Sequence, residues 1–160
     1  MKFFQQHGYE FYNNSIFDIG NAASRSQKTF LISGVDLISS QTLWSRVKKD
    51  LYYNFLMNYL GNSSQYKDFV YNDLENNLLL YNKTKADANI RSNKPKFIYT
   101  HLMMPHFPYY FNETGQLNQL ADLRYDQLKR KDLYLGYLKY CNRQVLSLVH
   151  HIKKATQGKA

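Results

Sequence analysis

The sequence predicts an α/β fold, in which helices pack on a β-sheet, and three observations predict it. Residues 2–7, Gly8 and residues 9–17 follow the order helix, glycine, strand, which is typical of an αβ unit. Residues 97–100 are β-branched or aromatic and apolar on both faces, as in a strand that helices cover on both sides. Helical periodicity occupies much of the remaining chain.

The N-terminal part starts with this helix–glycine–strand unit. Residues 18–28 are small and polar, which predicts a loop. Apolar residues then recur at a spacing of four over residues 43–59, which predicts an amphipathic helix that ends at Gly61. The residues of this stripe are Leu43, Val47, Leu51, Phe55 and Tyr59.

The C-terminal part predicts two more helices around the central strand. Residues 69–81 carry a weak apolar stripe, and the polar residues 84–93 predict a connection to the strand at residues 97–100. Residues 125–155 predict a long helix. Its apolar stripe consists of Tyr134, Leu138, Cys141, Val145, Leu148 and Ile152.

The bulk composition fits one domain over residues 1–160, with no signal peptide and no apolar run long enough for a bilayer. The formal net charge is +9, which would suit nucleic acid, an anionic surface or a phosphate-rich ligand. The basic residues are spread along predicted helices and mixed with acidic ones, so no nucleic-acid partner is expected. The single cysteine, Cys141, predicts a packed thiol rather than a disulfide or a zinc site.

Two histidines follow the central strand, one at its end and one in a proline-stiffened turn. Pro105 and Pro108 cannot donate to a sheet ladder, so the strand should stop near Met104. His106 lies between these prolines, and His101 precedes them. Because ligand sites in α/β sheets gather at the carboxyl ends of strands, these histidines are candidates for binding an anion or a metal.

The same segment carries a recognisable pattern. A Pro-His-x-Pro motif and a His-x(4)-His spacing occur together in His101-Leu102-Met103-Met104-Pro105-His106-Phe107-Pro108. An aromatic pair and an Asn-x-x-Gly turn follow, in Tyr109-Tyr110-Phe111-Asn112-Glu113-Thr114-Gly115. With residues 7–13 and 134–152 as flanking elements, the chain resembles the sulfatase-like branch of the alkaline phosphatase superfamily. This branch includes sulfatases, phosphoethanolamine transferases and lipoteichoic acid synthases.

The resemblance implies a partial three-layer α/β/α sandwich of alkaline-phosphatase-like type. It implies transfer or hydrolysis of a sulfate or phosphate ester beside a divalent metal, which would be zinc, calcium or manganese. For the parent protein it also implies the extracytoplasmic face of a bacterial membrane, with anchoring through segments outside this chain.

The family's reactive centre has no counterpart in this sequence. A Cys-x-Pro/Ala-x-Arg nucleophile motif and an Asp-His-Gly metal motif are both missing. The resemblance therefore implies a central portion of the catalytic domain, with no catalytic residue and no metal ligand of its own and inactive by itself.

Four residues are candidates for substrate binding. His106 matches the family histidine that contacts the sulfate or phosphate oxygens, and a turn-capping histidine is the alternative. His101 matches the transferase spacing, and the alternative is a strand histidine bonded to a carbonyl. Thr100 and Tyr109 flank the site and could bind substrate by hydrogen bonds, although packing is the simpler interpretation of both. Two other functions stay open, a small basic module that binds nucleic acid or an anionic surface, and a structural protein that keeps the fold without chemistry.

Overall fold

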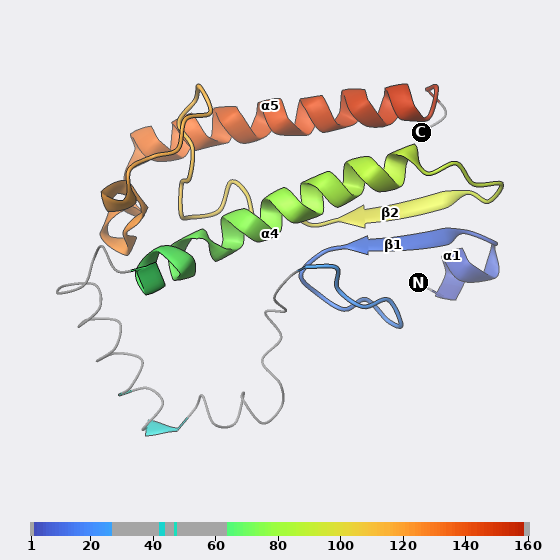
Figure 1. Ribbon diagram of the computed structural model, residues 1–160, viewed down its shortest axis with the longest axis horizontal. Helices are drawn as coiled ribbons and strands as arrows, with labels where there is room; N and C mark the ends of the chain where they lie inside the picture. The colour runs from blue at the N-terminus through green and yellow to red at the C-terminus, as the bar shows by residue number, and fades with distance from the viewer. Residues whose placement is uncertain (1, 27–41, 44–46, 48–63, 159–160) are drawn as a thin grey trace.

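The computed structural model describes residues 2–26, 42, 43, 47 and 64–158, and it layers two long helices on one side of a two-stranded parallel sheet (Figure 1). Helix α4 lies between α5 and the two strands, and both helices run opposite to the strand direction. The elements are α1 (Lys2–Gln6), β1 (Glu10–Asn14), α4 (Ser64–Asn89), β2 (Lys96–Thr100) and α5 (Lys131–Ala155), with 3-10 turns η1 (Leu120–Leu123) and η2 (Tyr125–Gln127).

The sheet confirms the two predicted strands. The first is shorter than the predicted residues 9–17, and the second starts one residue before the predicted 97–100 and ends at Thr100 rather than near Met104. Strand β1 pairs with β2 in parallel, from Glu10 opposite Lys96 to Asn14 opposite Thr100. Gly8 has a φ of +79°, a left-handed conformation that glycine adopts without strain, and it turns the chain from α1 into β1. The carboxyl ends of both strands therefore lie at the same end of the sheet. This end, formed by Asn14 and Thr100, is called the carboxyl edge below.

Helix α4 extends further than the sequence predicts. The polar residues 84–93 were expected to form a connection, but the helix continues to Asn89. Thr84 and Asp87 are polar yet almost fully buried, because their side chains form hydrogen bonds with the strand ends. A helix that is covered on two sides and satisfies its polar groups internally shows no clean apolar stripe in its sequence.

Helix α5 starts six residues later than predicted, at Lys131 rather than Tyr125, because the chain first forms the two 3-10 turns. Its buried face also differs in part from the predicted stripe. Cys141 is buried as expected, and Tyr137 is buried beside it, whereas Val145 of the predicted stripe is 50% exposed.

The main core is aromatic and joins the start of α4, the segment after β2 and the start of α5. Its buried members are Val70, Tyr109, Tyr110, Leu123, Tyr137 and Cys141. The Tyr110 hydroxyl donates to the Val70 carbonyl at 2.7 Å, so this deeply buried polar group is satisfied. Phe111 packs on Tyr140 with ring centroids 4.5 Å apart.

The helix predicted over residues 43–59 lies almost entirely outside the described residues. Of its predicted stripe, Leu43 and Val47 are described, and both are helical and exposed. None of the helices formed by described residues is long and apolar enough to span a membrane.

Candidate functional site

The carboxyl edge of the sheet brings the end of β1 next to the first candidate histidine. The backbone N–H of His101 donates to the Asn14 carbonyl at 3.0 Å, which extends the parallel pairing by one residue. Asn13 and Ser15 then fold the loop that follows β1. The Asn13 side-chain amide donates to the carbonyls of Phe17, Ala22 and Ala23, and the Ser15 hydroxyl donates to the Asn13 side-chain oxygen.

The His101 ring is partly buried at this edge. It stacks on Phe17, with ring centroids 5.4 Å apart and an interplanar angle of 24°. Its Nδ1 atom is buried, and it forms no hydrogen bond with a described residue. A buried ring nitrogen without a protein partner is unusual in a folded chain, so this atom is a place to look for a bound water or ligand.

His106 is exposed in the turn that follows. Its Nδ1 lies 3.0 Å from the Phe107 carbonyl oxygen, and both Met104–Pro105 and Phe107–Pro108 are cis peptides. Asp73, in the first half of α4, lies close enough for its carboxyl group to interact electrostatically with His106. Burial raises the pKa of the Asp73 carboxyl, and the charge of His106 opposes that shift.

The two other candidates use their polar atoms within the fold. The Thr100 hydroxyl is 2.7 Å from the Thr84 hydroxyl of α4. Tyr109 is buried in the aromatic core, and its hydroxyl donates to the Leu128 carbonyl at 2.9 Å. Burial raises the pKa of the Tyr109 hydroxyl, and Tyr134 adds to that shift. Packing and hydrogen bonding inside the fold thus account for both side chains.

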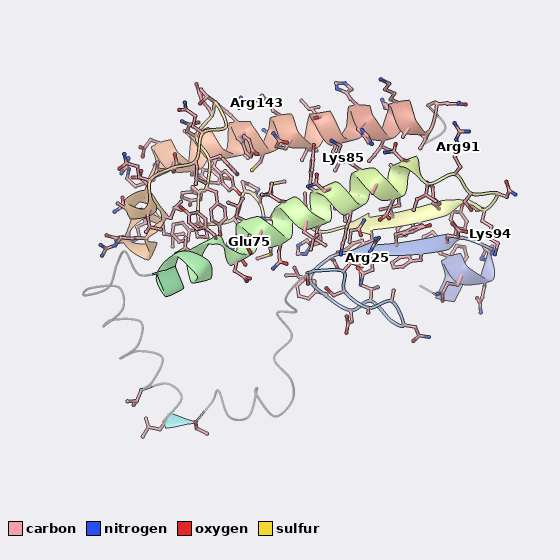
Figure 2. All side chains as sticks on the ribbon, in the orientation of Figure 1. Arg25, Glu75, Lys85, Arg91, Lys94 and Arg143 are labelled. Atoms are coloured by element: carbon pink, nitrogen blue, oxygen red, sulfur yellow. The ribbon has the colours of Figure 1, made fainter. Side chains whose placement is uncertain are left out.

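A charged network beneath α4 escaped the sequence analysis. The Asp87 carboxylate accepts hydrogen bonds from the Asn14 amide at 2.7 Å and from Nη1 of Arg25 at 2.6 Å. Arg25 is labelled in Figure 2. The signal that could have identified it is weak, because it consists of two asparagines at a strand end, one arginine in a polar loop and one aspartate in a polar helix segment.

A cavity of about 130 Å³ lies between α4, α5 and the segment that contains Met104 and Phe111. Tyr81 and Tyr137 are among the residues that line it, and neither candidate histidine lines it. This cavity is therefore separate from the carboxyl edge of the sheet.

The described residues do not assemble a metal site. No group of three or more His, Cys, Asp or Glu side chains in residues 2–26 and 64–158 is arranged to hold a metal ion. Cys141 is buried, and burial raises the pKa of its thiol to about 11, so the thiolate that would act as a ligand or nucleophile is disfavoured. We therefore assign no chemical step to a metal held by these residues.

In chemical terms, the carboxyl edge presents one half-buried imidazole and one partly exposed guanidinium, and the turn that follows presents one exposed imidazole. All three groups donate hydrogen bonds to oxyanions when they are protonated. Comparison of the chain with models of known protein families, with curated proteins and with solved structures finds no match.

Proposed function

We propose that this chain is the central part of the catalytic domain of a metal-dependent, sulfatase-like hydrolase or phosphotransferase. The substrate is a sulfate or phosphate ester, and the chain contributes histidines that bind its oxyanion. The nucleophile and the divalent metal are supplied by other parts of the complete protein.

The observation that carries this proposal is the placement of His101 directly after the carboxyl end of the parallel strand β2, with His106 in the turn that follows. Parallel strands in α/β sheets direct their carboxyl ends toward ligand sites. The two prolines of the turn hold the backbone around His106, whose side chain remains exposed. A restrained backbone with an exposed side chain suits the binding of a small anion, because little conformational freedom is lost on binding.

The hydrogen bonds of His106 suggest how it would act. A carbonyl oxygen can only accept, so the contact with Phe107 requires the proton on Nδ1. In the neutral ring, Nε2 is then an acceptor, whereas in the protonated ring it donates and carries charge. An oxyanion at Nε2 is therefore bound by the imidazolium form, which is also the form that stabilises negative charge in a transition state.

The test uses the complete protein that carries this chain. Turnover of an aryl sulfate and an aryl phosphodiester is measured with and without added divalent metal. We expect turnover of one of them to require metal and to fall about 100- to 1,000-fold in His106→Ala, as for the loss of one donor to a developing oxyanion. Near-normal turnover of His106→Ala would remove the assigned role.

The matched control is His150→Ala, which removes an exposed histidine on α5. This variant should turn over substrate at the wild-type rate. Far-ultraviolet circular dichroism of both variants separates loss of the oxyanion donor from loss of the fold. A complete protein that hydrolyses or transfers neither ester type, with any divalent metal, contradicts the proposed function.

A further inference from the structure

A guanidinium group lies at the same carboxyl edge of the sheet, on the side that faces α4. The Asp87 side chain is 2% exposed and accepts from Arg25 Nη1 at 2.6 Å. The second bond from Nη1 goes to the Asn14 side-chain oxygen at 3.0 Å. A buried carboxylate and a buried amide thus fix one side of the guanidinium.

The other side of the guanidinium is open. Arginine has five N–H donors, and the two bonds from Nη1 leave three of them on Nε and Nη2. No described residue accepts a hydrogen bond from Nε or Nη2, and the Arg25 side chain is 35% exposed. Nε and Nη2 form the planar fork that binds two oxygens of a carboxylate, sulfate or phosphate at once.

Charged groups of both signs surround the guanidinium. The Lys83 ammonium donates a hydrogen bond to the Arg25 backbone carbonyl at 2.5 Å, which brings a second cation to the network. Asp87 is the buried carboxylate within it, and the exposed Asp18 carboxylate accepts from the backbone N–H of Ser24 beside Arg25. The Tyr12 ring, with its centroid 5.9 Å from Arg25 Cζ, gives the guanidinium a further fixed neighbour.

The network is also joined to the candidate histidines. Asn14 accepts from Arg25 through its side chain and from the His101 backbone N–H through its carbonyl. Arg25 and His101 therefore contact the same residue at the end of β1.

We propose that Arg25 binds the tetrahedral oxyanion of a sulfate or phosphate ester through Nε and Nη2, with Asp87 and Asn14 as positioning residues. This inference rests on the proposed function and names a substrate-binding residue of the same carboxyl edge. Because Asp87 holds the guanidinium in place before the anion arrives, little side-chain freedom is lost on binding.

The experiment is a titration of the isotopically labelled complete protein that carries this chain, with inorganic sulfate and, separately, with inorganic phosphate, at constant ionic strength set by chloride. The Arg25 Nε–H resonance should shift and saturate with at least one of the two anions. Saturation by sulfate alone assigns a sulfate ester, and saturation by phosphate alone assigns a phosphate ester. Arg25→Lys, which keeps a cation beside Asp87 but lacks the fork, should weaken binding at least about tenfold.

Arg25→Met should abolish saturable binding, and circular dichroism shows whether it folds. If it does not fold, Arg25→Lys decides alone. Lys94→Met, which removes an exposed cation outside the network, is the matched control and should bind as the wild type does. Linear, non-saturating shifts with both anions, or equal affinity in Arg25→Lys, overturn the assignment.

The two proposals can fail separately. Saturable binding at Arg25 in a protein that turns over neither ester type keeps this anion site and removes the proposed function. Turnover that depends on His106, in a protein whose Arg25 resonance does not respond to either anion, keeps the proposed function and removes this inference.

Discussion

At the scale of single residues, the two histidines differ in how their rings are held. His101 is stacked on Phe17 and has a buried nitrogen that forms no hydrogen bond with a described residue, whereas His106 is exposed and its Nδ1 is hydrogen-bonded to the carbonyl of Phe107. The first ring is fixed by packing, and the second by its turn. Loss of His101 should therefore affect both stability and binding, while loss of His106 should affect binding with little change in stability.

The buried tyrosines of the core give a residue-scale prediction. Tyr110 is 1% exposed, and its hydroxyl donates to the Val70 carbonyl at 2.7 Å. Burial raises the pKa of this hydroxyl far above its usual value, so it remains a neutral donor across the range in which the protein would be studied. Tyr110→Phe leaves a buried carbonyl with one partner fewer and should lower the free energy of unfolding by about 1–2 kcal/mol.

Urea denaturation measures this change. The slope of unfolding free energy against urea should stay constant, because the surface exposed on unfolding hardly changes. Tyr134→Phe, at an exposed ring on the same region of α5, is the control and should change the free energy of unfolding by less than about 0.5 kcal/mol. Equal effects of the two substitutions would mean that the Tyr110 hydroxyl does not stabilise the core.

At the scale of elements, the carboxyl end of α4 is capped by a side chain from strand β2. Its last turn contains no basic residue of its own. Lys96, the first residue of β2, directs its ammonium to the carbonyls of Asp87, Ala88 and Ile90, at 2.7, 3.2 and 2.6 Å. A cation at the carboxyl end of a helix both satisfies orphan carbonyls and interacts favourably with the helix dipole.

Lys96→Met keeps the aliphatic stem and removes these bonds. We expect it to lower the free energy of unfolding by about 1–2 kcal/mol, since hydrogen bonds from charged donors are stronger than neutral ones. Amide exchange should speed up over the last turn of α4 before it does elsewhere. Lys94→Met, two residues away and exposed, is the matched control and should leave exchange unchanged. Unaltered exchange at residues 86–90 in Lys96→Met would argue against this capping role.

The start of α5 gives a prediction about pH. A hydrogen bond from Arg130 is the main cause that lowers the pKa of Asp132 from 3.8 to about 2, and the first amides of the helix add to the shift. Because the folded pKa is lower than the unfolded one, the contribution of Asp132 to stability is complete above the unfolded value. It is lost as the pH falls from about 4 to about 2.

Carbon-detected titration of the carboxyl group follows this shift directly. In Arg130→Met, the pKa of Asp132 should move most of the way back toward 3.8. The Glu113 carboxyl, whose pKa is lowered by its contact with Lys139, serves as the internal control and should not change. An Asp132 pKa that stays near 2 in the variant would assign the shift to the helix amides instead.

At the scale of the whole molecule, the sequence predicted more of the strands than of the site. Strand residues 97–100 could be identified because their β-branched and aromatic side chains are apolar on both faces. The end of α4 could not be placed, because Thr84 and Asp87 look like loop residues until their hydrogen bonds to Asn14 and Thr100 are known. Local pattern does not record contacts between residues that are 70 positions apart.

The same limit applies to the candidate site. A histidine between two prolines stands out in the sequence, so the turn around His106 was predictable. Arg25 lies in a polar loop with no distinguishing neighbours, and only the folded chain brings it to Asp87. Tyr109 was placed near the site by sequence proximity, whereas its ring turns into the core and its hydroxyl reaches Leu128.

The net charge of the whole molecule leads to a prediction about the alternative function. A basic module for nucleic acid needs its cations gathered on one face, with aromatic rings available for stacking. Here several cations already form hydrogen bonds with other residues of the chain: Arg25, Lys96 and Lys139. Of the basic side chains labelled in Figure 2, Lys85 of α4 is half-buried, and the exposed ones come from the loop before β2 and from α5: Arg91, Lys94 and Arg143. Such a distribution favours weak attraction to any polyanion over a defined interface.

We therefore expect a fluorescein-labelled single-stranded oligonucleotide to bind with a Kd no tighter than about 1 µM at physiological salt, as for non-specific electrostatic binding. Fluorescence anisotropy measures this affinity, and heparin should compete with the same efficiency as unlabelled oligonucleotide. Because no ring stacks on a base in this mode, tyrosine emission should stay constant on binding. Submicromolar affinity with quenched tyrosine emission and poor competition by heparin would instead favour the basic binding module, since stacking adds to affinity in a way that a simple polyanion cannot reproduce.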